Sequence, residues 1–305
     1  MDAISPDCQP EFARLKTALD AIAPASVDRR FALAYSGGLD SRFLAFAAKR
    51  LGFSPVLLHI VGPQIAPDET EQAIKAAEAI GLKAHCVSVS ALSIPALAQS
   101  GTRRCYTCKK TLFTALLQAA EELGELPAGA ALCDGTNYSD LDAFRPGLEA
   151  LRELGVRSPL AEAEITKPRI RSLGRAMGFP NPDQAARPCL LTRFPYGAAP
   201  APEMLRAVAQ AEKAIAEAFG EALRFRVRIP KSRDVRLHVE RKSLEALAQA
   251  RQSSPDALAQ ELQSLLARVW TGGDAALTVE VLETLSGYYD EIVLAAAAPS
   301  AHKLA

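Results

Sequence analysis

The sequence has little net charge, few cysteines and no long hydrophobic run, and each shortage excludes a class of protein. Lys and Arg total 35, and so do Asp and Glu, so the chain as a whole does not attract a polyanion such as tRNA. No apolar run approaches the roughly 20 residues that span a bilayer, and the first residues lack the basic and apolar segments of a leader. We therefore expect a cytoplasmic protein with neither a membrane nor a nucleic acid as partner.

Cysteine is sparse, because six residues in a chain of 305 are too few for a disulfide scaffold. In a reducing compartment such cysteines are core residues, metal ligands or reactive thiols. Cys86 and Cys133 lie in apolar strand patterns and are predicted to be core residues. Cys105, Cys108 and Cys189 have basic neighbours instead and are candidates for chemistry.

Apolar strand-like runs alternate with helical patterns through the first 190 residues. Strands are predicted over residues 31–35, 55–62 and 83–90, and helices over residues 40–51, 67–80 and 105–123. This alternation predicts an α/β fold with a doubly wound parallel sheet. Gly52, Gly81, Gly124 and Gly178 each follow a helical run, where a left-handed residue commonly ends a helix.

A smaller second domain is predicted after the proline-rich segment of residues 178–202, which is typical of a functional loop or a domain boundary. A helix is predicted over residues 202–219, followed by strands over 223–229, 234–240 and 276–282 and two helices rich in Ala and Leu. We expect one domain over residues 1–197 and a small α+β domain over residues 198–305.

The stretch "FALAYSGGLDSRFLAF" (residues 31–46) runs from a strand through two glycines directly into a helix. Glycines allow a tight turn in which backbone N–H groups converge, and the helix N-terminus adds positive potential, so the segment predicts a phosphate site. It is neither a Walker P-loop nor a G-x-G-x-x-G dinucleotide loop. The plain alternative is a strand-to-helix turn with Asp40 as the N-cap.

"SGGLDS" resembles the signature loop of the PP-loop ATP pyrophosphatases, which split ATP between its α and β phosphates. The resemblance implies a PP-loop (HUP-like adenine nucleotide alpha hydrolase) fold for residues 1–197. It also implies an ATP pyrophosphate site formed by Ser36, Gly37, Gly38, Asp40 and Ser41. Asp40 would in addition help to hold Mg²⁺.

Cys105 and Cys108 are spaced i, i+3 near the start of a predicted helix, so both sulfurs point the same way. The helix dipole and the flanking Arg-Arg and Lys-Lys pairs favour the thiolate form. The C-x-x-C spacing fits a redox pair, half of a zinc site or part of an iron–sulfur site. Cys189, in a loop with two arginines, is the candidate third thiol.

Five motifs, in order, are similar to the LarE family of sulfur transferases, which make the nickel-pincer nucleotide cofactor of lactate racemase. They are "SGGLDS", "CYTCKK", "DGTNYSD", "DAFRPGLEALRELGVRSPL" and "CLLTRFPYG", and the similarity covers residues 31–228. The resemblance implies adenylylation of a carboxylate on a pyridinium-3,5-dicarboxylate mononucleotide, with release of pyrophosphate. Sulfur then replaces AMP to give a thiocarboxylate. The family also forms homo-oligomers.

Cys189 matches the family's sulfur-bearing cysteine. Members with that cysteine alone give up its sulfur, whereas members with three cysteines hold a [4Fe-4S] cluster whose open iron binds the sulfur to be transferred. Cys105, Cys108 and Cys189 therefore imply the cluster type, although the residues alone leave zinc, a disulfide or a sacrificial Cys189 open. The sulfur donor is not indicated by the sequence.

The resemblance also implies a substrate site in the second domain, with Glu212 as a site residue and Arg226 and Arg228 as phosphate-binding residues. Arg193 is a further candidate for the substrate phosphate. Residues 226 and 228 of a strand share one face, so two guanidinium groups can bind one phosphate. The alternative is a solvated basic face.

"DGTNYSD" follows a predicted strand, so its polar side chains emerge at the carboxyl edge of the sheet, where open α/β folds bind ligands. Asp134, Asn137 and Asp142 are candidates for Mg²⁺ or nucleotide binding, and Arg145 is a candidate for a phosphate. The alternative is an Asx-turn.

Three other functions remain as alternatives. A tRNA 2-thiolation enzyme also combines a PP-loop with cysteines, but the neutral charge does not favour it. An amidating PP-loop synthetase uses ammonia and needs no thiols. A zinc-stabilised nucleotide-binding sensor would bind metal without chemistry.

Overall fold

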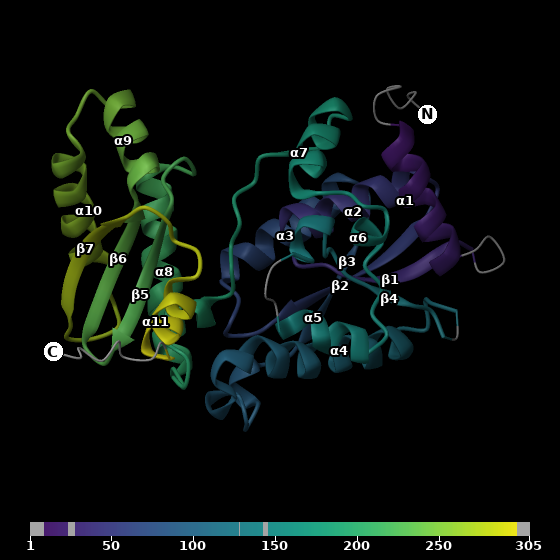
Figure 1. The fold of residues 1–305 in the computed structure, drawn as a ribbon, viewed down its shortest axis with the longest axis horizontal. Coiled ribbons are helices and arrows are strands. Elements are labelled where there is room, and N and C mark those ends of the chain that lie inside the picture. Colours follow the sequence, from purple (N-terminus) through teal and green to yellow (C-terminus); the bar gives the residue numbers. More distant parts are fainter. Residues whose placement is uncertain (1–8, 24–27, 128, 143–145, 298–305) are drawn as a thin grey trace, which may run out of the picture. The chain divides into compact units, whose positions relative to one another are not determined.

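The computed structural model describes residues 9–23, 28–127, 129–142 and 146–297 (Figure 1). The chain forms two compact units. The first contains Met1–Leu97 and Arg103–Pro188, and the second contains Ala98–Thr102 and Cys189–Ala305. The roles predicted for the two domains stay predictions.

The first unit is built on a four-stranded sheet with the strand order β3-β2-β1-β4. Its strands are β1 (Arg30–Ala34), β2 (Ser54–Val61), β3 (Ala84–Ser88) and β4 (Leu132–Cys133). The pairs β1 with β2, β1 with β4, and β2 with β3 are all parallel. The predicted α/β fold with a parallel sheet is therefore confirmed.

Helices cover both faces of this sheet. Successive side chains of β1 point to opposite sides, and the two sides contribute to two different cores. Leu33 belongs to a core with α1 (Gln9–Ile22), α2 (Leu39–Arg50), α3 (Pro67–Ala79), α6 (Pro159–Glu162) and α7 (Lys167–Ala176). Ala32 belongs to a second core with α4 (Arg104–Glu122) and α5 (Pro146–Glu153). Short 3₁₀ turns lie at η3 (Ala91–Ser93), η4 (Ala98–Arg103) and η5 (Tyr138–Asp140).

The four glycines predicted to end helices all have left-handed backbone angles. The φ angles are +81° at Gly52, +64° at Gly81, +62° at Gly124 and +66° at Gly178. Each follows the helix that the pattern predicted, so these helix ends are confirmed.

One of the two predicted core cysteines is wrong. Cys133 on β4 is buried, as expected, and burial raises the pKa of its thiol well above the ordinary value. Cys86 is exposed. It lies on β3, which is an edge strand of the sheet, and so a side chain in an apolar pattern remains open to solvent.

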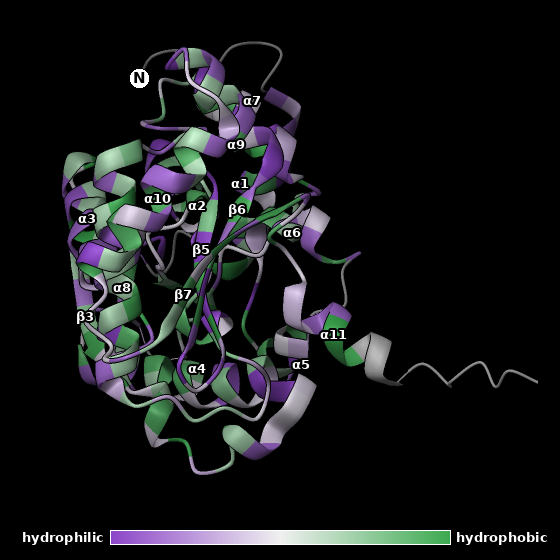
Figure 2. Cartoon of the chain, turned by 90° about the vertical axis from the view of Figure 1, so that its left-hand side faces the viewer, coloured by the Kyte–Doolittle hydropathy of each residue, from purple (hydrophilic) through white to green (hydrophobic). Residues whose placement is uncertain are grey.

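The second unit has a three-stranded mixed sheet with the order β5-β6-β7. Its strands are β5 (Phe225–Lys231), β6 (Asp234–Glu240) and β7 (Ala276–Leu282), with β5 antiparallel and β7 parallel to β6. Its helices are η6 (Leu190–Arg193), α8 (Pro202–Phe219), α9 (Arg241–Ala250), α10 (Pro255–Val269) and α11 (Tyr288–Ala297). In Figure 2, α8 carries both hydrophobic and hydrophilic bands, as expected of a helix with one buried side. None of the helices described is both long and apolar enough to cross a membrane.

Candidate active site

The turn between β1 and α2 depends on Gly37, which has a φ of +74°. A Cβ atom at this position would lie 2.4 Å from the Cβ of Ala73 on α3, so the backbone of the turn lies directly against that helix. Gly38 is the N-cap of α2, and Asp40 lies inside its first turn. Asp40 is therefore not the N-cap of α2, and its carboxylate can bind another group.

Two serine hydroxyls face each other across this turn. Ser36 Oγ lies 3.1 Å from Ser41 Oγ and accepts a hydrogen bond from the Gly38 N–H at 3.3 Å. Ser41 Oγ also lies 3.2 Å from the Gly38 carbonyl oxygen, to which it donates. Gly135, after β4, comes so close that an added Cβ would be 2.8 Å from the Ser41 nitrogen. The loops after β1 and β4 thus meet at the helix N-terminus.

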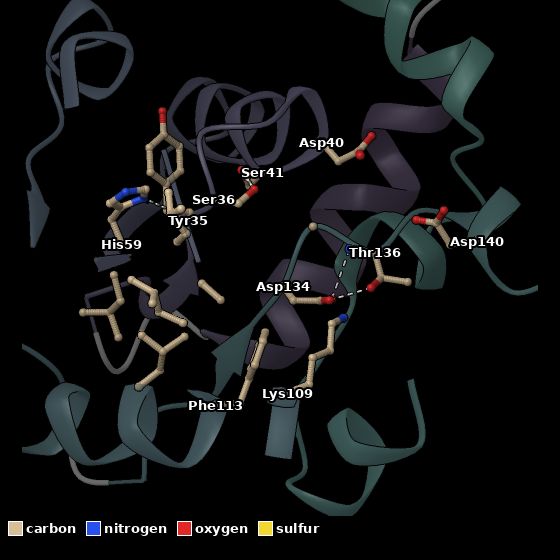
Figure 3. A pocket seen from close by; sticks show the side chains of 16 residues that line it. Tyr35, Ser36, Asp40, Ser41, His59, Lys109, Phe113, Asp134, Thr136 and Asp140 are labelled. Atoms are coloured by element: carbon tan, nitrogen blue, oxygen red, sulfur yellow. Dashed lines mark hydrogen bonds between the residues drawn. The ribbon is translucent and has the colours of Figure 1, made fainter. Parts of the chain in front are cut away.

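A pocket of about 360 Å³ opens beside these loops (Figure 3). It brings together four of the predicted site residues, Ser36, Asp40, Ser41 and Asp134, along with Asp140. These side chains come from the turn after β1 and the start of α2, and from the segment after β4 that includes η5. Both lie at the carboxyl edge of the sheet, where ligands of open α/β folds bind.

Asp40 has one paired and one unpaired carboxylate oxygen. Its Oδ2 accepts a hydrogen bond of 2.5 Å from Lys167 Nζ, and its Oδ1 is buried without a hydrogen-bond partner among the described residues. Burial raises the pKa of Asp40, and the charge and hydrogen bond of Lys167 oppose that rise. An unpaired, buried carboxylate oxygen beside a phosphate-type loop fits a ligand of Mg²⁺.

Two lysines of this site were not assigned to it from the sequence. Lys167 begins α7, 127 residues after Asp40, and no local pattern connects the two. Lys109 follows the C-x-x-C motif and lines the pocket, with its Nζ 5.6 Å from the centre of the Phe113 ring (Figure 3). Its spacing of i, i+4 from Phe113 is the signal that could have placed both residues on one helix face.

The wall of the pocket next to β2 is uncharged. His59 is fully buried, with Nδ1 2.9 Å from the Tyr35 carbonyl oxygen and Nε2 3.1 Å from Thr70 Oγ1. Burial lowers the pKa of His59 and raises the pKa of the Tyr35 hydroxyl to about 12. Both groups are therefore neutral near pH 7, and the charges of the pocket come from its aspartates and lysines.

The polar residues after β4 mainly hold their own loop. Asp134 accepts hydrogen bonds from the Thr136 N–H at 3.1 Å and from Ser158 Oγ at 2.7 Å, and it also accepts one from the Thr136 hydroxyl. Asn137 caps η5. Asp142 lies on an exposed turn outside the pocket lining, and Arg145 lies outside the described residues. Their predicted ligand roles stay predictions.

Cys105 and Cys108 lie at the start of α4 in the first unit, and Cys189 precedes η6 in the second. None of the three forms a disulfide bond with another described cysteine, and Cys105 and Cys189 are exposed. Within the part of the chain that the structure describes, no set of three or more His, Cys, Asp or Glu side chains is arranged to bind a metal ion.

Two of the cations that flank the C-x-x-C motif pair with carboxylates of α5. Arg103 lies 3.0 Å from Glu149, and Lys110 lies 2.5 Å from Glu153. These exposed pairs fasten the start of α4 to α5. The sequence suggested that these cations act on the thiols. The structure shows that the carboxylates of α5 partly compensate their charges.

The second unit contains a cluster around the partly buried Glu212, in which Arg193 and Arg228 are buried. Arg193 Nε and Nη2 donate to its carboxylate at 2.7 Å and 2.8 Å, and the Val227 N–H donates at 2.8 Å. Burial opposes ionisation of Glu212, but the charge and hydrogen bonds of Arg193, and the charge of Arg226, keep the pKa of Glu212 below its usual value. Glu212 thus remains a carboxylate that orients Arg193.

Arg226 and Arg228 lie on one face of β5, as predicted, opposite His238 and Arg236 of β6. Arg228 is only 4% exposed, and its guanidinium carbon lies 4.5 Å from the centre of the Tyr288 ring. Its Nε is buried without a hydrogen-bond partner in the described part of the chain. The charges of Arg193 and Glu212 both act on it, so the structure brings all four predicted residues of this domain together.

No protein-family model matches the chain, but individual known proteins are similar to it. An uncharacterised protein of Synechocystis is 39% identical over 184 residues, which are 60% of this chain and 67% of that protein. Pyridinium-3,5-bisthiocarboxylic acid mononucleotide synthase of Lactiplantibacillus plantarum is 31% identical over 187 residues, 61% of this chain and 66% of the synthase. This similarity agrees with the LarE-like resemblance of the motifs. An uncharacterised protein of Methanocaldococcus jannaschii is 29% identical over 199 residues, 65% of this chain and 74% of that protein.

Proposed function

We propose that this LarE-like chain is an ATP-dependent sulfurtransferase of nickel-pincer cofactor synthesis. It would adenylylate a carboxylate of a pyridinium-3,5-dicarboxylate mononucleotide and then exchange AMP for sulfur. The observation that carries the proposal is the unpaired Oδ1 of Asp40 beside the β1–α2 turn, in a chain similar to a synthase named for a bisthiocarboxylic acid mononucleotide. We also propose that the protein is cytoplasmic and, as the resemblance implies, a homo-oligomer.

The β1–α2 turn would bind the pyrophosphate portion of ATP through Gly37, Gly38 and the hydroxyls of Ser36 and Ser41. Asp40 Oδ1 would hold Mg²⁺, which supplies positive charge between the phosphate groups when bound. The remaining charge stabilisation falls to the lysines that reach this site from α4 and α7.

The two chemical steps are balanced by their leaving groups. A carboxylate oxygen of the substrate attacks the α-phosphorus of ATP, and the bond to the β-phosphate oxygen breaks to release pyrophosphate. A sulfur nucleophile then attacks the carboxyl carbon, and AMP leaves with the original carboxylate oxygen. The adenylate is needed because a free carboxylate oxygen is a poor leaving group.

We further propose that Cys105, Cys108 and Cys189 bind a [4Fe-4S] cluster. Thiolates are the ligands that such clusters require, and Cys105 and Cys189 are exposed, whereas the buried thiol of Cys133 is inaccessible. When bound, the cluster supplies an iron that carries the sulfur to be transferred. In the second unit, Arg193, Arg226 and Arg228 would bind the substrate phosphate.

The proposal is tested with Asp40→Asn and Cys189→Ala variants, supplied with ATP, Mg²⁺ and the pyridinium dicarboxylate mononucleotide. Asp40→Asn should abolish pyrophosphate release, because the neutral amide binds Mg²⁺ poorly. Cys189→Ala should still release pyrophosphate but form no thiocarboxylate. Asp256→Asn, in the exposed first turn of α10, is the matched control and should retain both products. Normal pyrophosphate release by Asp40→Asn, or thiocarboxylate formation by Cys189→Ala, would contradict these roles.

The metal content of anaerobically purified protein tests the cluster separately. Iron and acid-labile sulfide should be present in the wild type and lost in Cys105→Ala. Cys86→Ala, which removes an exposed thiol from β3, should keep both. Bound zinc without sulfide would identify a structural metal site instead.

A further inference from the structure

His238 is a buried imidazole in the middle of the charged face of the second unit's sheet. It lies on β6, opposite Arg226 of β5 and Glu280 of β7. The residue is completely buried, although its neighbours across the strands are charged. A histidine in an apolar core would not face charged residues such as Arg226 and Glu280, so the contacts of His238 need an explanation.

The contacts of His238 define its protonation. Its Nδ1 lies 2.7 Å from Arg228 Nη1, and a guanidinium group can only donate, so Nδ1 accepts and carries no hydrogen. The hydrogen is then on Nε2, which lies 3.1 Å from Glu280 Oε2, although not in good alignment for a hydrogen bond. The ring packs edge-to-face on Tyr288, with the ring centres 4.6 Å apart. Burial, with the charges of Arg228 and Arg236, lowers the pKa of His238 to about 4, in agreement with a neutral ring.

These contacts also fix the guanidinium of Arg228. Nη1 is held by His238, Nη2 donates to the Leu285 carbonyl oxygen at 2.5 Å, and Tyr288 lies against the guanidinium plane. A side chain held in this way loses less conformational freedom when it binds a ligand. The acceptor at Nη1 is neutral, so it orients the arginine without cancelling its positive charge. A carboxylate in the same place would orient it equally well but would compete with an anion.

We propose that His238 is a positioning residue, which holds Arg228 ready for a phosphate group while leaving the charge of Arg228 available. The inference rests on the proposed function, because it takes Arg228 to be a phosphate-binding residue. It adds a role for a residue that does not touch the substrate. The decisive property is that the acceptor is neutral.

His238→Asn and His238→Asp form a matched pair for the test, because their side chains have the same shape and both present an oxygen acceptor near the place of Nδ1. Binding of nicotinic acid mononucleotide, a pyridinium carboxylate mononucleotide, to the full chain is measured by calorimetry at pH 7.5. Asn should bind within about threefold of the wild type, whereas Asp should bind at least about tenfold more weakly, because it pairs with the charge of Arg228. Arg228→Ala should also lose at least about tenfold.

Each outcome has one meaning. If Arg228→Ala binds as well as the wild type, the phosphate role in the proposed function fails. If Arg228→Ala is weakened but the Asn and Asp variants bind alike, the role of His238 alone is overturned. Should the Asp variant not fold, the wild type still tests the inference by long-range ¹H–¹⁵N NMR. His238 should be protonated only at Nε2 at pH 7.5, and a protonated Nδ1 would overturn it.

Discussion

The close approach of the β1–α2 turn to α3 makes Gly37→Ala the most informative stability test of the candidate site. Two separate effects act at this position. The φ of +74° is left-handed, which costs an alanine about 1–2 kcal/mol. The new methyl would also lie 2.4 Å from Ala73 Cβ and 3.0 Å from Ala73 Cα, so backbone must move. Overpacking of this kind costs about 1–3 kcal/mol, which makes the total about 2–5 kcal/mol.

Gly52→Ala is the matched control for the first effect. Its φ is +81°, and an added Cβ would meet no atom within 4 Å, so it should lose only the left-handed contribution of about 1–2 kcal/mol. Urea unfolding of both variants separates the two contributions. In addition, Gly37→Ala should bind ATP at least about tenfold more weakly, because the displaced turn no longer converges its N–H groups.

The double variant Gly37→Ala/Ala73→Gly removes the methyl group that the new Cβ would strike. It should recover ATP binding towards the wild type, although glycine in the interior of α3 costs about 1 kcal/mol of stability. If Gly37→Ala is no less stable than Gly52→Ala and binds ATP normally, the turn does not depend on contact with α3, and the reasoning is refuted.

Two further predictions concern thiols and pH. In the native protein, Cys86 should react with iodoacetamide, whereas Cys133 should react only after unfolding because it is buried. Peptide mass spectrometry measures the labelling of each cysteine. Rapid labelling of Cys133 in the native protein would contradict the prediction. The folded state holds His238 at a pKa of about 4, whereas the unfolded chain has the ordinary value of about 6.5, so the unfolded state takes up the proton first as the pH falls. The free energy of unfolding should therefore decrease by up to about 3 kcal/mol between pH 6.5 and pH 4 in urea titrations, and His238→Asn, which cannot titrate, should lose that part of the slope.

Much of the fold could be predicted from local patterns. Continuous apolar runs located β1 and β2, which are buried on both faces, and hydrophobic periodicity located the long helices, which are buried on one face. The glycines that follow the helices could also be predicted, because a helix commonly ends at a left-handed residue and glycine adopts that conformation most easily. The strand-turn-helix at Gly37 and Gly38 carried enough local information to indicate the pocket before any tertiary contact was known.

What the sequence could not show depends on partners far away in the chain. An apolar pattern does not distinguish an edge strand from a central one, and so Cys86 was assigned to the core. Lys167 reaches Asp40 only through the packing of α7 beside α2. The cations next to Cys105 were expected to act on the thiols, yet Arg103 and Lys110 pair with α5, a helix whose position the pattern does not reveal.

The charge of the cluster around Glu212 in the second unit argues for a ligand more strongly than any single contact does. Arg193, Arg226 and Arg228 contribute three positive charges and Glu212 one negative charge, so these four interacting groups carry a net charge of +2. Buried charge is costly unless it is compensated, and a purely structural Arg228 would be better served by a carboxylate than by the neutral ring of His238. A phosphate bound at Arg228 would add negative charge and would stabilise the folded state by binding to it. The neutral acceptor at Arg228 is therefore the feature that an anion site needs and that a purely structural arginine does not.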